Sequence, residues 1–330
     1  MKQLICLKPS YLYVFPLVVL FYFFTGIANA LPNDAKIYLT ISVDWEGRDL
    51  DPINIDLMNK FRDQHPELPL LHFLNAAYFT KEGIDKFEVR KKIRSVLREQ
   101  DELGLHIHAW KSLVEASGVN YRHLPKWTPK KYHQRQIEAC AFKDCGHEVP
   151  ISSYSFAELV KIIETSMGIL SAQGFPKPVS FRAGGWMASS NVLQALAHQG
   201  FLYDSSEVSY THFKERLKDY AIPQWTAQLW PNASAVSQPY AIETGYTDVT
   251  EMPDNGCLAD YMSADDMLKV FRENVRVWQL NPSKPIYIHF GFHQETAKKY
   301  LHRVHQAINE IKLVAKKQLI PLEFVTFSMQ

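Results

Sequence analysis

The sequence lacks the features that mark several large classes of protein. Its 330 residues carry a formal net charge of only +1, with no basic face, no basic stripe interleaved with aromatic residues and no glycine-rich phosphate loop. These absences argue against a nucleic-acid-binding protein. There is also no internal repeat and no low-complexity tract. The composition is 46% hydrophobic and 22% charged, which predicts a folded chain with a large buried core.

Cysteine is scarce as well. There are four cysteines, and Cys6 lies within the first 30 residues, which we expect to be removed as described below; this leaves Cys140, Cys145 and Cys257. The C-x4-C spacing beside His147 raises the possibility of a zinc site, but no second pair of ligands accompanies it. The spacing therefore favours either a disulfide between Cys140 and Cys145 or two free thiols.

The amino terminus resembles a secretory leader. Lys2 and Lys8 precede an apolar run over residues 11–27, and Ala28-Asn29-Ala30 has the small-x-small pattern of a signal-peptidase site. We expect a signal peptide over residues 1–30, cleaved after Ala30, and a periplasmic or secreted protein. An uncleaved membrane anchor is the alternative, but Pro16 interrupts the run. No later segment has the length of a spanning helix, so we expect no stable membrane span after cleavage.

Strand and helix patterns alternate along residues 31–330, which we expect to form a single catalytic domain. Expected strands cover residues 37–43, 68–75, 103–108, 178–182, 201–205, 284–290 and 321–327, with β character also over 240–251. Expected helices cover 53–64, 86–102, 155–174, 191–198, 263–280 and 295–317. Segments 109–150 and 211–240 look irregular. Alternating β and α units predict an α/β fold with a parallel sheet, either a barrel or a doubly wound sheet.

Polar side chains gather at the ends of the apolar strands. Successive strand residues face opposite ways, so Asp44 and Glu46 share one face, and His106 and His108 share another. Two neighbouring carboxylates repel each other, and burying them costs several kcal/mol unless a positive group lies nearby. Paired imidazoles on one strand face can bind a single metal ion. The two pairs together predict a divalent-metal site; the alternative is a solvated strand end with surface acids.

Other strand ends offer further candidates. Arg182 could orient an acidic side chain, and Trp186 could stack on a sugar, or both could serve stability alone. Tyr203 and Asp204 are a weaker pair, because aspartate is common at turns. On the late strand His289 is the favoured site residue. His293 would reach the same face only if the strand stays extended that far.

In motif order, these residues resemble a known family. Asp44-x-Glu46, the stretch ELGLHIH over residues 102–108, FRAGGW over 181–186, YDSS over 203–206 and the late IHF over 288–290 are similar to the polysaccharide deacetylases of the NodB-homology class, carbohydrate esterase family four. The resemblance is closest to members associated with surface-polysaccharide loci. It implies a distorted (β/α) barrel of about seven parallel strands. It also implies a divalent cofactor, often zinc, and a polysaccharide or amino-sugar substrate that loses acetyl groups.

The resemblance also implies roles for individual residues. Asp44 matches the general base, Glu46 and His106 match metal ligands, Arg182 matches the residue that orients the base, and His289 matches the general acid. The family's second metal histidine falls at Trp110 here, so His108 would have to take that place. Tyr203, Asp204, Trp186 and Trp110 would then contact substrate.

Two other functions are compatible with the same residues. Trp110 stands where the family has its second metal histidine, and this difference fits a catalytically inactive carbohydrate-binding protein on the same fold. Another metal-assisted hydrolase, acting on a different amide or ester, is the third possibility.

Overall fold

The computed structural model describes residues 35–329, so the predicted signal peptide lies outside the described residues. Among them, no helix is long and apolar enough to cross a membrane. The strands are β1 (Ile37–Asp44), β2 (Leu71–Leu74), β3 (Glu102–Ile107), β4 (Ser180–Ala183), β5 (Tyr203–Asp204), β6 (Tyr240–Ile242), β7 (Val249–Glu251), β8 (Ile286–His293) and β9 (Leu322–Phe324). The helices are α1 (Pro52–Gln64), α2 (Lys86–Val96), α3 (Lys111–Ala116), α4 (His133–Ala139), α5 (Phe156–Ala172), α6 (Ser190–His198), α7 (Ile222–Leu229), α8 (Ala264–Leu280) and α9 (Ala297–Gln318).

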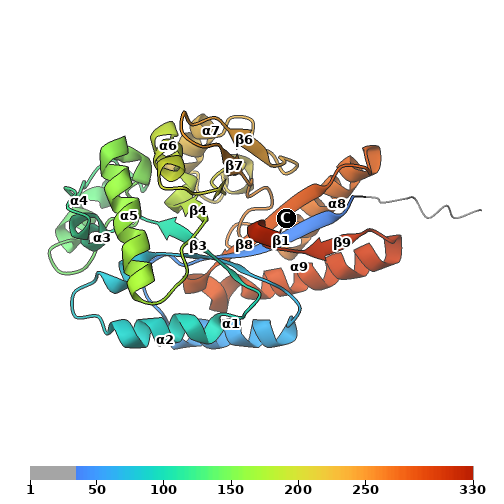
Figure 1. Ribbon diagram of the computed structural model, residues 1–330, viewed down its shortest axis with the longest axis horizontal. Helices are drawn as coiled ribbons and strands as arrows, with labels where there is room; N and C mark the ends of the chain where they lie inside the picture. Colours follow the sequence, from blue (N-terminus) through green and yellow to red (C-terminus); the bar gives the residue numbers. More distant parts are fainter. Residues whose placement is uncertain (1–34, 330) are drawn as a thin grey trace, which may run out of the picture. The chain divides into compact units, whose positions relative to one another are not determined.

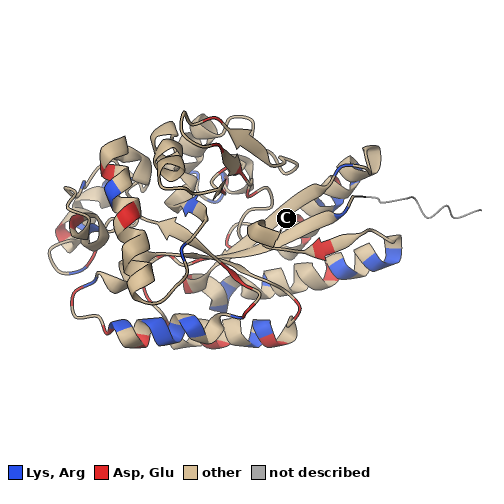
Figure 2. Cartoon of the chain, in the orientation of Figure 1, with Lys and Arg blue, Asp and Glu red and all other residues tan. Residues whose placement is uncertain are grey.

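The strands form one curled sheet in the order β6-β7-β5-β4-β3-β2-β1-β8. Every pair along it is parallel except β6 with β7, and β9 pairs in parallel with the first three residues of β1. The expected α/β barrel of about seven parallel strands is therefore confirmed, with β6 and β9 as additions. In Figure 1 the helices α1, α2 and α9 lie along the outside of the curled sheet. Charged residues are concentrated on these helices (Figure 2).

An irregular segment, rather than a strand, closes the gap between β7 and β8. The amide of Gly256 donates to the carbonyl of His289 at 2.9 Å, and the amide of Ala259 donates to Gly291 at 2.8 Å. A Cβ on Gly256 would lie 2.1 Å from the ring of Phe290, so only glycine permits this approach. The segment thus closes the barrel with backbone hydrogen bonds.

Buried apolar residues fill two separate regions. The larger core lies between the sheet and the helices, where Phe61 of α1 meets Phe292 of β8 with ring centroids 6.1 Å apart. A smaller cluster of Leu71, Phe73, Met252 and Phe327 lies on the other side of the strands, inside the barrel. Because strand side chains alternate, β1 supplies Ile41 and Val43 to the outer core and directs Ser42 and Asp44 inward.

Candidate metal centre

The carboxyl ends of β1, β3 and β8 meet at one mouth of the barrel. Asp44 and His293 are partners in the register of β1 and β8, and His106 and Arg182 are partners in β3 and β4. A cleft of about 1650 Å³ opens over these residues. Parallel pairing therefore brings together side chains that are far apart in the sequence, as the strand-end motifs predicted.

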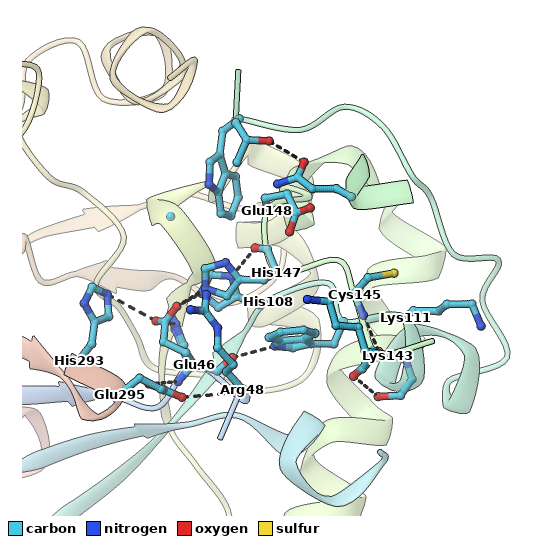
Figure 3. Close-up of a pocket in the computed structure, with 18 of the residues that line it drawn as sticks. Glu46, Arg48, His108, Lys111, Lys143, Cys145, His147, Glu148, His293 and Glu295 are labelled. Carbon is cyan, nitrogen blue, oxygen red and sulfur yellow. Dashed lines mark hydrogen bonds and ion pairs between the residues drawn. The ribbon is translucent and has the colours of Figure 1, made fainter. Parts of the chain in front are cut away.

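Glu46 lies at the centre of this mouth, ringed by imidazoles (Figure 3). Its Oε1 is 3.2 Å from Nε2 of His106, and its Oε2 is 2.9 Å from Nε2 of His108. Nε2 of His147 lies 2.5 Å from the same Oε2. Three imidazole nitrogens therefore converge on one carboxylate, and all of these side chains are buried or nearly so.

The outer nitrogens of two of these rings fix the tautomer. Nδ1 of His106 donates to the carbonyl oxygen of Arg182 at 2.8 Å, and Nδ1 of His108 donates to the carbonyl oxygen of His147 at 2.7 Å. A carbonyl oxygen only accepts, so each Nδ1 carries its proton. In the neutral ring each Nε2 then directs a lone pair at Glu46, an arrangement that a cation between them would stabilise.

The donor set fits a divalent metal ion such as zinc. Two groups of three potential ligands, Glu46 with His108 and His147, and Asp44 with Glu46 and His106, each bring their ligand atoms within 4.8 Å of one another. Imidazole nitrogen and carboxylate oxygen are ordinary zinc ligands.

Protonation of the ligands agrees with that fit. Burial alone would raise the pKa of Glu46, but His108, His293 and His106 together hold that pKa well below its usual value. Burial and the neighbouring His108 lower the pKa of His147 to about 3. At neutral pH the centre therefore offers a charged carboxylate and a neutral His147 ring, the forms that bind a metal.

A buried ion pair stands beside Glu46. Nη1 of Arg182 lies 2.9 Å from Oδ1 of Asp44 and also donates to the hydroxyl of Ser42 at 3.0 Å. The guanidinium is held from the other side by Ser205, whose carbonyl accepts from Nε at 3.0 Å. The expected pairing of Arg182 with an acid is therefore present, and it fixes the Asp44 carboxylate facing the cleft.

His293 approaches Glu46 from β8. Its Nε2 is 3.5 Å from Oε1 of Glu46, and its Nδ1 is 3.0 Å from Asp260, which in turn accepts from the Thr296 hydroxyl at 2.7 Å. Burial opposes protonation of His293, but Asp260 and Glu46 outweigh it and raise its pKa to about 10. His293 is therefore a protonated, oriented group at the mouth.

The structure places His289, the expected general acid, away from the cleft. Both its ring nitrogens lie 3.2–3.3 Å from Nη2 of Arg182, and the ring packs edge-on against Phe327. It does not line the cleft, because it precedes His293 by four strand residues and so lies about 13 Å deeper in the barrel. Burial and Arg182 also keep its pKa well below the usual value, which leaves it neutral.

Two of the expected substrate contacts, Tyr203 and Asp204, lie away from the cleft. Asp204 is fully buried and accepts from the Ser206 hydroxyl at 2.8 Å, and Tyr203 packs against Phe327. Trp186 lines the cleft but is only 3% exposed, and it stacks on Phe213 with ring centroids 5.1 Å apart, so that face of the indole is not available to a sugar.

Trp110 does line the cleft, but it has a structural partner. Its Nε1 donates to the backbone carbonyl of Glu46 at 2.7 Å. The indole therefore holds the backbone of the central carboxylate, in the position where the family pattern has a metal histidine.

Sequence reasoning missed His147 and Asp260 as site residues. His147 follows the Cys140–Cys145 pair, which is disulfide-bonded, so the expectation of a disulfide or free thiols in place of a thiolate zinc site is confirmed. The cysteine pair just before His147, which can close a short loop, was the only sign in the sequence that His147 is held in a fixed position. Asp260 belongs to the irregular segment after β7, where no periodicity points to its partner.

Comparison with known proteins supports the fold. A polysaccharide deacetylase candidate from Mycobacterium smegmatis has a TM-score of 0.50 at 14% identity, covering 90% of each chain. A family 4 carbohydrate esterase from Streptomyces lividans, solved with acetate, has a TM-score of 0.42 at 10% identity, covering 87% of this chain and 91% of that one. A 4-alpha-glucanotransferase from Thermococcus litoralis has a TM-score of 0.49 at 12% identity, covering 89% of this chain and 40% of that one.

These similarities concern the fold and not the reaction. The Mycobacterium smegmatis structure, at a TM-score of 0.50 and 14% identity, supports a shared fold alone, and the reaction has to be argued from the site. No protein-family model matches the sequence, and no curated protein matches it.

Proposed function

We propose that this chain, which has the fold of a polysaccharide deacetylase, is a metal-dependent hydrolase that removes acetyl groups from the amino sugars of a polysaccharide. One observation carries the proposal. The Nδ1 protons of His106 and His108 are committed to backbone carbonyls, so their Nε2 atoms face Glu46, directly beside a buried Asp44–Arg182 pair. That combination provides metal ligands and a general base in one cleft.

We assign the ligands to Glu46, His108 and His147, with His106 on the other oxygen of Glu46. Zinc fits this set of ligands. A divalent cation held there would polarise the acetyl carbonyl and lower the pKa of water at the site.

The chain's own residues supply the proton transfers. Asp44, oriented by Arg182, accepts a proton from the attacking water, whose oxygen bonds to the acetyl carbon. The carbon–nitrogen bond breaks, and His293 donates its proton to the departing amine while Asp260 holds the ring. The products are acetate and a free amino sugar.

We further propose that the protein acts outside the cytoplasm, after cleavage at Ala30. The disulfide between Cys140 and Cys145 supports this location, because such bonds persist mainly in oxidising compartments.

Acetate release from a panel of N-acetylated glycans, measured for wild type and Asp44→Asn, tests the activity. Loss of the base should lower turnover about a hundredfold or more. Metal content of both proteins serves as the control, because Asp44→Asn leaves Glu46, His108 and His147 in place.

A catalytically inactive carbohydrate-binding protein is the second candidate. It is favoured by Trp110, which occupies a metal-histidine position of the family pattern and is hydrogen-bonded to the backbone of Glu46. If the wild-type protein binds metal and glycans but releases no acetate, this second function is supported and the deacetylase is rejected. Acetate release from other amides or esters, but from no amino sugar, would indicate a different metal-assisted hydrolase.

A further inference from the structure

The cleft extends well beyond the metal centre. It continues past His147 toward Cys145 and Lys143 (Figure 3). Its volume of about 1650 Å³ exceeds the 300–1,000 Å³ typical of sites for small molecules. The part of the chain between β3 and α5 builds this extension and carries the disulfide. One acetylated sugar over Glu46 would leave the extension empty.

Three exposed aromatic side chains line the cleft, and none of the large aliphatic side chains that are exposed among residues 35–329 does. Phe142 is 92% exposed, Tyr132 is 43% exposed and Tyr220 is 37% exposed, and all three line it. The most exposed aliphatic residues, Leu280 and Leu319, do not. A surface for a lipid or an apolar peptide would be expected to include aliphatic side chains, whereas flat aromatic rings suit the apolar C–H face of a pyranose.

Phe142 is the best placed of these aromatic residues. It lies within the loop closed by the Cys140–Cys145 disulfide, so its backbone is held in place. No aromatic or cationic side chain among residues 35–329 stacks on its ring. A fixed and unpartnered ring loses little conformational entropy when a ligand stacks on it.

We infer that Phe142 and Tyr132 form a sugar-binding subsite, which takes a pyranose ring of the polysaccharide lying beyond the acetylated sugar. This inference rests on the proposed function for the class of ligand, since it assumes that the cleft holds a carbohydrate. It adds where a second sugar of that polysaccharide binds, in the extension of the cleft beyond the metal centre. Lys143, next to Phe142 and on the same cleft wall, provides a hydrogen-bond donor for sugar hydroxyls.

Equilibrium binding to N-acetylated oligosaccharides, from the monosaccharide to the hexamer, tests the subsite. The measurements use the Asp44→Asn protein, so that the ligand is not consumed. We expect affinity to rise with length. Phe142→Ala in that background should weaken binding of the longer oligomers about tenfold and leave the monosaccharide unaffected. The matched control is Phe87→Ala, which removes an aromatic ring that is 59% exposed on α2, outside the cleft.

The outcomes separate the subsite from the proposed activity. Length-dependent binding that is lost in Phe142→Ala, together with no acetate release by wild type, supports the subsite and rejects the deacetylase. Equal binding by Phe142→Ala and Phe87→Ala at every length overturns the subsite, as does failure of every oligomer to bind. A change of oligomeric state in Phe142→Ala, measured by analytical ultracentrifugation, would also overturn it, because the ring would then serve a contact between copies.

Discussion

The ring of His147 lies flat on the ring of His108, with centroids 4.0 Å and planes 6° apart, while the carbonyl oxygen of His147 accepts the Nδ1 proton of His108 at 2.7 Å. Each histidine therefore positions the other. Both rings direct Nε2 at the same oxygen of Glu46, and two stacked imidazolium ions there would repel each other. Together with burial, this contact lowers the pKa of His147 to about 3, so the His147 ring is neutral and able to bind a cation.

Loss of His147 should weaken metal binding. We expect His147→Ala to bind zinc at least tenfold more weakly than wild type, because one ligand and the support of His108 disappear together. Calorimetric titration with zinc and metal content after dialysis measure this. His302→Ala, which removes an exposed histidine on α9, should match wild type. Unchanged affinity in His147→Ala would exclude it as a ligand.

A glycine behind His108 should be as important as the ligand itself. A Cβ on Gly184 would lie 2.7–2.8 Å from three atoms of the His108 ring, so Gly184→Ala must displace that ring. We expect about a tenfold loss of zinc affinity in a folded protein. Gly168→Ala, in α5 with no atom within 4 Å of the new Cβ, should keep full affinity and gain about 0.5–1 kcal/mol in free energy of unfolding.

The two histidines of β8 should behave in opposite ways. We expect His293→Ala to lower kcat about a hundredfold, because it removes the proton donor at the mouth; it also leaves Asp260 without its partner, so some thermal stability is lost as well. His289→Ala should instead lower the free energy of unfolding by about 2 kcal/mol, since it leaves a hole beside Arg182 and Phe327, and should change kcat less than tenfold. Steady-state kinetics and thermal melts on both variants measure these effects. A larger loss of kcat in His289→Ala than in His293→Ala would identify His289 as the general acid.

The buried pair of Asp204 and Glu251 should make stability depend on pH. Burial raises the pKa of Asp204 to about 6, and burial and Asp204 raise the pKa of Glu251 well above its usual value. Unfolded carboxyl groups titrate near pH 4, so the folded chain holds a proton that the unfolded chain has lost. This contribution is fully present below about pH 4 and is lost as pH rises through the two raised pKa values.

Glu251→Gln should remove that dependence. Its amide can donate to Asp204, so we expect the variant to exceed wild type in free energy of unfolding by about 1 kcal/mol or more at about pH 8, and by less at about pH 5. Urea unfolding at both pH values measures the difference. Glu243→Gln, an exposed change near β6, should follow wild type at each pH, and the prediction fails if the two variants behave alike.

Much of the fold was predictable, because it rests on local patterns. Alternation of apolar and polar residues placed Asp44 and His106 on inward strand faces, and strand–helix alternation predicted the parallel barrel. The ends of elements were less predictable. The late strand was expected to stop at Phe290, but β8 stays extended to His293, which is why the sequence favoured His289 over His293.

The rest of the candidate site depends on long-range contacts without a periodic pattern. His147 reaches Glu46 because the disulfide closes the preceding loop and the amide of Lys111 donates to the carbonyl of Cys145 at 2.7 Å. Trp186 lines the cleft as expected, but its stacking on Phe213 depends on packing that the sequence does not show.

The carboxyl-terminal residues after β9 fill the interior of the barrel at the amino ends of its strands. Phe327 fills the interior against Phe73 and Tyr203, and the amide of Ser328 donates to Glu102 at the start of β3. Across residues 35–329, these contacts close the interior of the barrel, so the polysaccharide of the proposed function would lie across its mouth. A glycan chain in that position would present a sugar from its middle, and the proposed reaction would then need no free chain end.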